Sequence, residues 1–155
     1  HQGKRQTYGL LYMTNKARHR GHTTFDSTAI IKDQFPQTVK INPVSAAERG
    51  IKDGELVYVY NDRGCMRIPA ELTHAVLPGF VSIEHGAWYR PSKETVTVWQ
   101  RNRLTNTDEP VTTFVDYGGT DNLLTDDDYT LDTPFSCQTL AAQTGPCEVS
   151  KTKPQ

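Results

Sequence analysis

The sequence predicts a mainly β fold, a small barrel or sandwich with one or two short helices. Short runs rich in Val, Ile, Tyr and Thr recur along the 155 residues, and turn residues separate most of them. Only one stretch has a clear helical pattern. The length is that of one ordinary domain and is enough to bury a core. We therefore expect a single domain covering residues 1–155.

Five segments are the strongest strand candidates, namely residues 8–14, 38–42, 55–61, 64–74 and 79–85. The third and fourth flank Asp62 and Arg63, and Gly64 is available for a positive φ, which together predict a hairpin. Residues 111–117 and 147–151 are weaker candidates. The alternation of apolar and polar residues in these runs predicts strands that bury one face.

One short helix is predicted in the stretch NPVSAAERGIKDGE, residues 42–55. Asn42 or Ser45 is a suitable N-cap, and Gly50 is a suitable stop. The helix would have about two turns. Residues 90–110 are predicted to be a polar insertion, and residues 151–155 a tail.

The charge balance excludes several classes of function. Lys plus Arg is 17 and Asp plus Glu is 18, so the chain has none of the basic excess of a nucleic-acid or membrane-surface binder. No apolar run approaches the ~18 residues that a membrane span needs. We expect no nucleic-acid partner and no direct membrane span.

The three cysteines are odd in number and widely spaced. Their spacing argues against a zinc ribbon or an iron–sulfur cluster that this chain ligates alone. A disulfide between Cys137 and Cys147 stays open, and the cysteine count does not settle the redox compartment.

The most promising polar segment is TNKARHRGHTTFDS, residues 14–27, which gathers cations, histidines and hydroxyl side chains. Phosphates are held by such loops through backbone N–H groups, hydroxyls and arginines. A solvated loop is the alternative. His19 and His22 have a spacing that suits a metal, but no third ligand lies nearby, so we expect no metal site.

Three further segments carry candidate binding groups. Asn42 and Ser45 lie at a strand-to-helix junction, where polar groups face a ligand. Gly118 and Gly119 allow close approach of the backbone, and Asn122 offers a donor and an acceptor. The segment 84–91, EHGAWYRP, ends a strand in aromatic residues that a core would equally explain. GxSxG, GxGxxG and P-loop motifs are absent, which disfavours a self-contained hydrolase and a Rossmann- or Walker-type nucleotide site.

Taken in order, these segments resemble one family. The most specific stretches are INPVSAAERGIKDGELVYVYNDRG and LTHAVLPGFVSIEHGAWY, preceded by RGHTT and followed by DYGGTDNLLT. They resemble the C-terminal dinucleotide-binding domain of molybdopterin oxidoreductases, the dimethyl sulfoxide reductase superfamily. Within it they are most similar to catalytic subunits of anaerobic dimethyl sulfoxide reductases. The resemblance covers roughly residues 8–150.

The resemblance implies a double-psi β-barrel that helps to hold a molybdenum bis(molybdopterin guanine dinucleotide) cofactor. It implies that the loop with His22 and Thr23, preceded by Arg20, touches the cofactor, and that Asn42 lies near the guanine. Relatives often carry Asp where this chain has Ser45, which puts a carboxylate contact to guanine in doubt. The implied cofactor-binding set is Arg20, His22, Thr23, Asn42, Ser45, Gly118, Gly119, Asn122 and Gln138.

In this superfamily the metal ligand and the cluster cysteines belong to an earlier part of the chain. The resemblance therefore implies a domain of a longer enzyme of anaerobic respiration, not catalytic alone, which serves two-electron or oxygen-atom transfer. Its partners would be the other domains of the parent chain and an iron–sulfur electron-transfer subunit. The compartment would be periplasmic or membrane-associated if the parent has an export signal, and otherwise cytoplasmic. The alternative is a barrel that acts as a binding module without a redox cofactor.

Overall fold

The computed structural model describes residues 8–102, 104–125 and 144–154. The strands in these residues are β1 (Leu10–Lys16), β2 (Val39–Ile41), β3 (Leu56–Tyr60), β4 (Cys65–Leu72), β5 (Phe80–His85), β6 (Pro91–Asn102), β7 (Thr107–Asp116) and β8 (Thr144–Ser150). The helices are α1 (Ala29–Gln34), α2 (Pro43–Glu48) and a 3₁₀ turn, η1 (Asp121–Leu123). No helix in the described part of the chain is long and apolar enough to cross a membrane.

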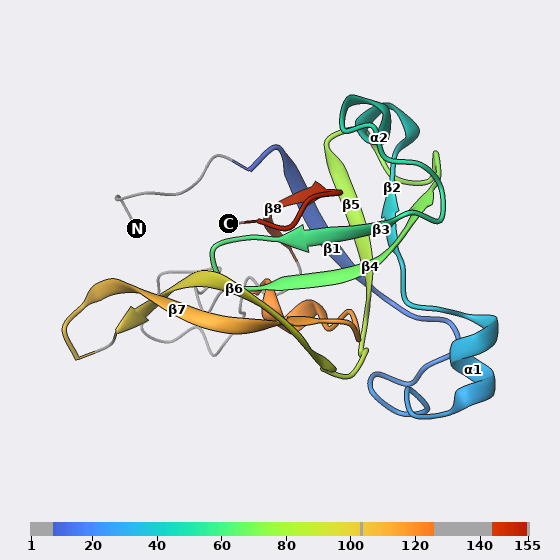
Figure 1. Cartoon of the computed structure of the whole chain (residues 1–155). Helices are drawn as coiled ribbons and strands as arrows, with labels where there is room; N and C mark the ends of the chain where they lie inside the picture. The colour runs from blue at the N-terminus through green and yellow to red at the C-terminus, as the bar shows by residue number, and fades with distance from the viewer. Residues whose placement is uncertain (1–7, 103, 126–143, 155) are drawn as a thin grey trace, which may run out of the picture.

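Six of the strands close into a barrel, as Figure 1 shows. The sheet order is β2-β5-β1-β8-β3-β4, and a further pairing of β2 with β4 joins its two ends. β1 pairs with β5 and β2 with β4 in parallel, whereas the remaining neighbours in the ring are antiparallel. This closed arrangement confirms the predicted double-psi β-barrel with two short helices.

The barrel core follows the alternation in the sequence. The buried side chains include Val39 and Ile41 of β2 and Val57 and Val59 of β3, none of which has exposed surface. The residues that alternate with them lie nearer the solvent or belong to a second cluster of buried residues, which β3, β4, β6 and β7 form. Fully burying each such side chain contributes about 1.5–3 kcal/mol. The five strongest strand candidates are all confirmed, with bounds that differ by a few residues.

The predicted helix is confirmed as α2, and the open choice of cap is settled. The side chain of Asn42 accepts a hydrogen bond from Val44 N at 3.0 Å, and Gly50 stops the helix with φ of 63°. The predicted β3–β4 hairpin is also confirmed, but the reason given for Gly64 was wrong. Gly64 is not among the residues with positive φ; instead a Cβ there would lie 2.7 Å from the carbonyl oxygen of Leu123.

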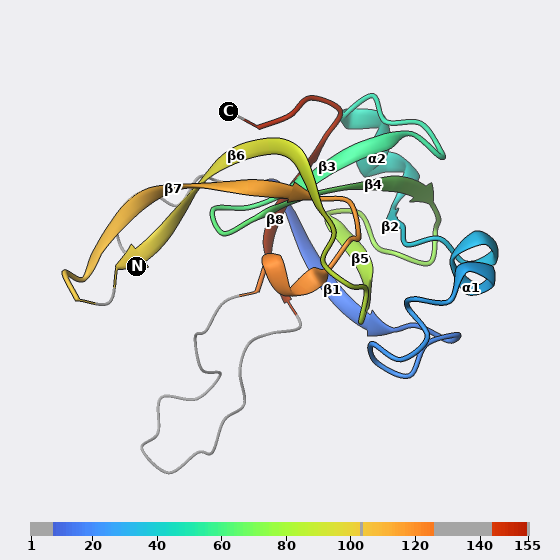
Figure 2. The same cartoon turned by 60° about the horizontal axis from the view of Figure 1, so that its bottom comes forward.

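The segment predicted as a polar insertion forms most of a long hairpin. β6 and β7 pair antiparallel, and the ribbon projects from the barrel away from α1 and α2 (Figure 2). Val96 and Val98 of β6 are buried against Val115 of β7, whereas Thr97 between the two valines is exposed. Only one face of this hairpin is buried, so its polar composition is compatible with strands.

Candidate functional site

Three loops meet at one end of the barrel because of how β1 and β5 pair. The two strands are parallel, and Lys16 at the end of β1 lies opposite His85 at the end of β5. The chain therefore leaves both strands at the same end. The segment after β7 reaches this end too, because Gln37 Nε2 donates to the carbonyls of both Glu84 and Gly119. We call residues 21–24, 85–88 and 118–122 the loop face.

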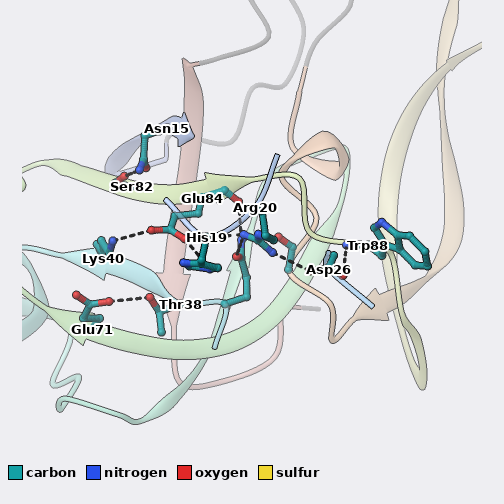
Figure 3. Close-up of polar contacts among 12 residues, drawn as sticks. Asn15, His19, Arg20, Asp26, Thr38, Lys40, Glu71, Ser82, Glu84 and Trp88 are labelled. Carbon is teal, nitrogen blue, oxygen red and sulfur yellow. Dashed lines mark hydrogen bonds and ion pairs between the residues drawn. The ribbon is translucent and has the colours of Figure 1, made fainter. Parts of the chain in front are cut away.

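Arg20 is buried beneath this face rather than displayed on it. Its side chain is 5% exposed. It donates to Asp26 Oδ1 at 2.8 Å (Figure 3). It also donates to Gln37 Oε1 at 2.6 Å. The guanidinium therefore ties its own loop to the barrel. A direct contact of Arg20 with the cofactor stays a prediction, and its present partners are protein groups.

Two carboxylates organise the charges around Arg20. Asp26 also accepts from Trp88 N at 3.1 Å and pairs with Lys32 of α1 at 3.3 Å. Glu84 pairs with Lys40 of β2 at 3.0 Å and approaches His19 and Arg20 (Figure 3). Buried charges are tolerated when they are paired in this way. The network fixes the loop after β1 against α1, the sheet and the segment after β5.

His22 and Thr23 lie exposed on the loop face while their backbone is held in place. His22 has φ of 56°, and a Cβ at Gly86 would collide with the carbonyl of His22. The carbonyl of Thr23 accepts from the indole of Trp88 at 3.0 Å. The imidazole and the hydroxyl thus remain available to a ligand on a fixed backbone.

The glycines of the third loop are required by packing within the chain. A Cβ at Gly118 would collide with the carbonyl of Trp88, and one at Gly119 would lie 2.6 Å from Gln37 Cγ. The buried Asp116 shapes this loop by accepting from the backbone of Arg90, Gly118 and Thr120. Asn122 is exposed, and its side chain makes no hydrogen bond with other described residues.

Asn42 and Ser45 lie at the opposite end of the barrel. Asn42 donates to the carbonyl of Val76, and Ser45 accepts from Gly79 N, just before β5 begins. The loop face begins where β5 ends, five residue steps and roughly 17 Å further along. Figure 1 shows the same separation between α2 and α1. Both side chains are buried and occupied, so their predicted role near guanine stays a prediction.

Some predicted features lie outside the described residues. These are Gln138 and Cys137. Cys65 and Cys147 are described, and both are free and buried. Burial raises the pKa of the Cys65 thiol to about 12. Among the described residues, no group of three or more His, Cys, Asp or Glu side chains is arranged to hold a metal ion.

A cationic groove of about 290 Å³ borders the loop face beneath α1. Its lining includes one carboxylate, that of Asp26, and four cations, namely Arg20, Lys32, Arg67 and Arg90. Most of this charge is already neutralised. Arg67 pairs with Glu94 at 3.3 Å and donates to Tyr117, and that hydrogen bond raises the pKa of Arg67. Because its cations are mostly paired within the protein, we do not regard the groove as a binding site separate from the loop face.

Sequence reasoning missed two residues of the loop face, His85 and Asp121. His85 Nδ1 lies 2.9 Å from Asp121 Oδ2, and the His85 and His22 rings are 5.7 Å apart. The sequence held a weak signal, since His85 ends a strand directly before a glycine. Nothing in the sequence pairs it with Asp121, which lies on a different loop.

Comparisons with known proteins agree with this architecture. Residues 10–136 match the family model of the molydopterin dinucleotide binding domain. The chain is 38% identical over 77 residues to dimethyl sulfoxide reductase DmsA of Haemophilus influenzae, covering 50% of this chain and 10% of that protein. It is 46% identical over 72 residues to trimethylamine-N-oxide reductase of Vibrio vulnificus, covering 46% of this chain and 8% of that protein.

The fold is similar to part of one solved structure as well. Acetylene hydratase from Pelobacter acetylenicus matches with a TM-score of 0.54 and 19% identity, over 78% of this chain and 15% of that chain. The chain thus spans about a tenth of the length of the curated relatives that it matches. Because the family model covers most of the chain, this protein belongs to the molydopterin dinucleotide binding domain family.

Proposed function

We propose that the chain is the C-terminal cofactor-holding domain of a longer molybdenum oxidoreductase, and that its loop face binds the bis(molybdopterin guanine dinucleotide) cofactor. One observation carries the proposal furthest. The loop face presents the side chains of His22, Thr23 and Asn122 to solvent, on a backbone that hydrogen bonds and close contacts of glycines hold in place. Such preorganised polar groups are typical of a ligand site.

The polar side chains of the loop face fit a ligand that carries both phosphate groups and heterocyclic rings. An imidazole and a hydroxyl donate hydrogen bonds to phosphate oxygens, and a carboxamide both donates and accepts. Asp121, which is 2% exposed, keeps its Oδ1 buried without a hydrogen-bond partner among the described residues. The loop face therefore combines donors for phosphate with groups that pair with a pterin or guanine edge.

In this proposal the cofactor carries out the chemistry, and this chain binds and positions the cofactor. The bound cofactor would supply two-electron or oxygen-atom transfer. His22 and Thr23 would bind it, and the pair of Arg20 with Asp26 would hold their loop in position. Gly86 and Gly118 would keep the neighbouring loops close enough to form one surface.

The remaining functional expectations belong to the parent enzyme. We infer a reductase of S-oxides or N-oxides, because the relatives carry those names. The metal ligand, an iron–sulfur cluster and an electron-transfer subunit complete the same proposal, either elsewhere on the parent chain or on a partner. The 155-residue chain alone would then have no turnover with oxygen donors.

The proposal is tested by cofactor content in the full-length parent. The double substitution His22→Ala and Thr23→Ala should lower the molybdenum and pterin retained per chain about tenfold, because hydrogen bonds to a charged group contribute roughly 1.5–3 kcal/mol. Lys93→Ala, at an exposed position on β6, is the matched control and should change nothing.

Two results would contradict the proposal. Equal cofactor content in the double variant, the control and the parent would show that the loop face does not bind the cofactor. A purified parent protein that contains neither molybdenum nor pterin would instead favour the alternative, a barrel that acts as a binding module without a redox cofactor.

A further inference from the structure

His85 and Asp121 form a polar pair on the loop face. His85 is the last residue of β5, and Asp121 is the first residue of η1, within the third loop. Their Nδ1 and Oδ2 atoms lie 2.9 Å apart, with 35% of the His85 side chain exposed but only 3% of Asp121. The carboxylate is thus inside the protein, and the imidazole connects it to the surface.

The pair fixes which nitrogen of His85 is available. A carboxylate only accepts hydrogen bonds, so Nδ1 carries a proton toward Asp121. Nε2 makes no hydrogen bond with other described residues. Because the Nδ1 side of the ring faces the buried carboxylate, the exposed part of the side chain includes Nε2. Asp121 therefore orients His85 with its second nitrogen toward solvent.

His22 lies directly beside this nitrogen-bearing ring. The two ring centroids are 5.7 Å apart with an angle of 89° between the planes. Close packing of Gly86 against the carbonyl of His22 holds the two loops together, so the spacing of the imidazoles is set by the backbone. Two imidazoles this close, of which one is backed by a carboxylate, form a donor pair suited to one phosphate-bearing ligand.

We propose that His85 is a further anion-binding residue of the loop face, that it acts together with His22 on a phosphate group, and that Asp121 is its positioning residue. The inference rests on the proposed function and deepens it, since it assigns the pyrophosphate part of the ligand to this pair of histidines. It also gives a role to His85 of the segment EHGAWYRP, whose aromatic residues a core would equally explain.

The test uses the 155-residue chain and inorganic pyrophosphate at pH 6. Ring signals of His22 and His85 in NMR spectra should both shift as pyrophosphate is added. His85→Gln and Asp121→Asn should each weaken binding at least threefold. The double variant should bind no more weakly than His85→Gln alone, because a positioning residue acts only through its partner. His74→Gln, in the exposed turn after β4, is the matched control.

The outcomes separate this inference from the proposed function. Shifts at His22 alone, with unchanged affinity in His85→Gln, would overturn the role of His85 and leave the loop face intact. Independent, additive losses from His85→Gln and Asp121→Asn would overturn the positioning role of Asp121. The absence of any shift at either histidine would count against both this inference and the anion site of the proposed function.

Discussion

A buried ion pair between Arg20 and Asp26 holds the loop after β1 in place. Asp26 is 4% exposed and takes its main counter-charge from Arg20, whose side chain is 5% exposed. Arg20→Ala should therefore lower the free energy of unfolding by about 3 kcal/mol, because it leaves a buried carboxylate with a weaker partner. Urea unfolding measures this change. Arg18→Ala, at an exposed position of the same loop, should change stability by less than ~0.5 kcal/mol. Equal effects of the two substitutions would refute the structural role of Arg20.

Glu148 of β8 makes the stability of the barrel depend on pH, because its carboxylate is bonded to groups near β1 and α2. Burial alone would raise its pKa, but hydrogen bonds from Arg49, Val149 N and Gly9 N hold the pKa of Glu148 below its usual value. A carboxyl whose pKa is depressed by folding contributes stability above its unfolded pKa of about 4.3 and loses it as the pH falls through the folded value. The folded chain should thus lose stability below about pH 5.

Glu148→Gln tests that contribution. The variant should be less stable than the parent chain at pH 7, and the difference should shrink as the pH falls toward 3, since protonation removes the same charge. Urea midpoints measured across this range follow the effect. A difference that is constant from pH 7 to pH 3 would show that the charge of Glu148 contributes nothing to folding.

At the residue scale, the sequence identified the polar loops but not their internal pairings. Arg20 was a reasonable ligand candidate because it stands beside His22 and Thr23 in the chain. Its partners Gln37 and Glu84 come from distant segments, and only the folded barrel brings them together. The pair of His85 with Asp121 was missed for the same reason.

At the element scale, the predicted strands were those in which one face is continuously apolar. The β6–β7 hairpin was harder to predict because its outer face mixes polar and aromatic residues, with Thr95, Thr97 and Trp99 opposite Phe114, Thr112 and Pro110. Helix α1 gave no signal, because it has no buried residue and Thr28 provides no side-chain cap. Such short elements depend on their tertiary contacts.

The root of the hairpin is fastened by Glu94 of β6. Tyr58 and Tyr117 donate to its two oxygens at 2.8 and 2.5 Å, and these hydrogen bonds lower the pKa of Glu94. Glu94→Ala should speed amide hydrogen exchange in β6 and β7 about tenfold while the barrel strands keep their rates. Lys93→Ala, at the exposed neighbouring position, is the control. Uniform exchange rates across parent and variants would show that the hairpin needs no such anchor.

At the scale of the whole molecule, the barrel separates its polar segments into two ends. The parallel register of β1 with β5 gathers the three loops at one end and leaves Asn42 and Ser45 with α2 at the other. The family resemblance predicted the closed barrel, since its motifs span most of the chain. It did not predict this separation, because the register of long-range strand pairs is not visible in one sequence.

The central claim is that the loop face holds a pterin dinucleotide. A structure of the full-length parent with its cofactor bound tests it most directly. We predict cofactor oxygens or ring nitrogens within hydrogen-bond distance, about 2.7–3.2 Å, of His22, Thr23 and His85. A structure in which the cofactor contacts none of these side chains, and the loop face meets only protein or solvent, would contradict the account.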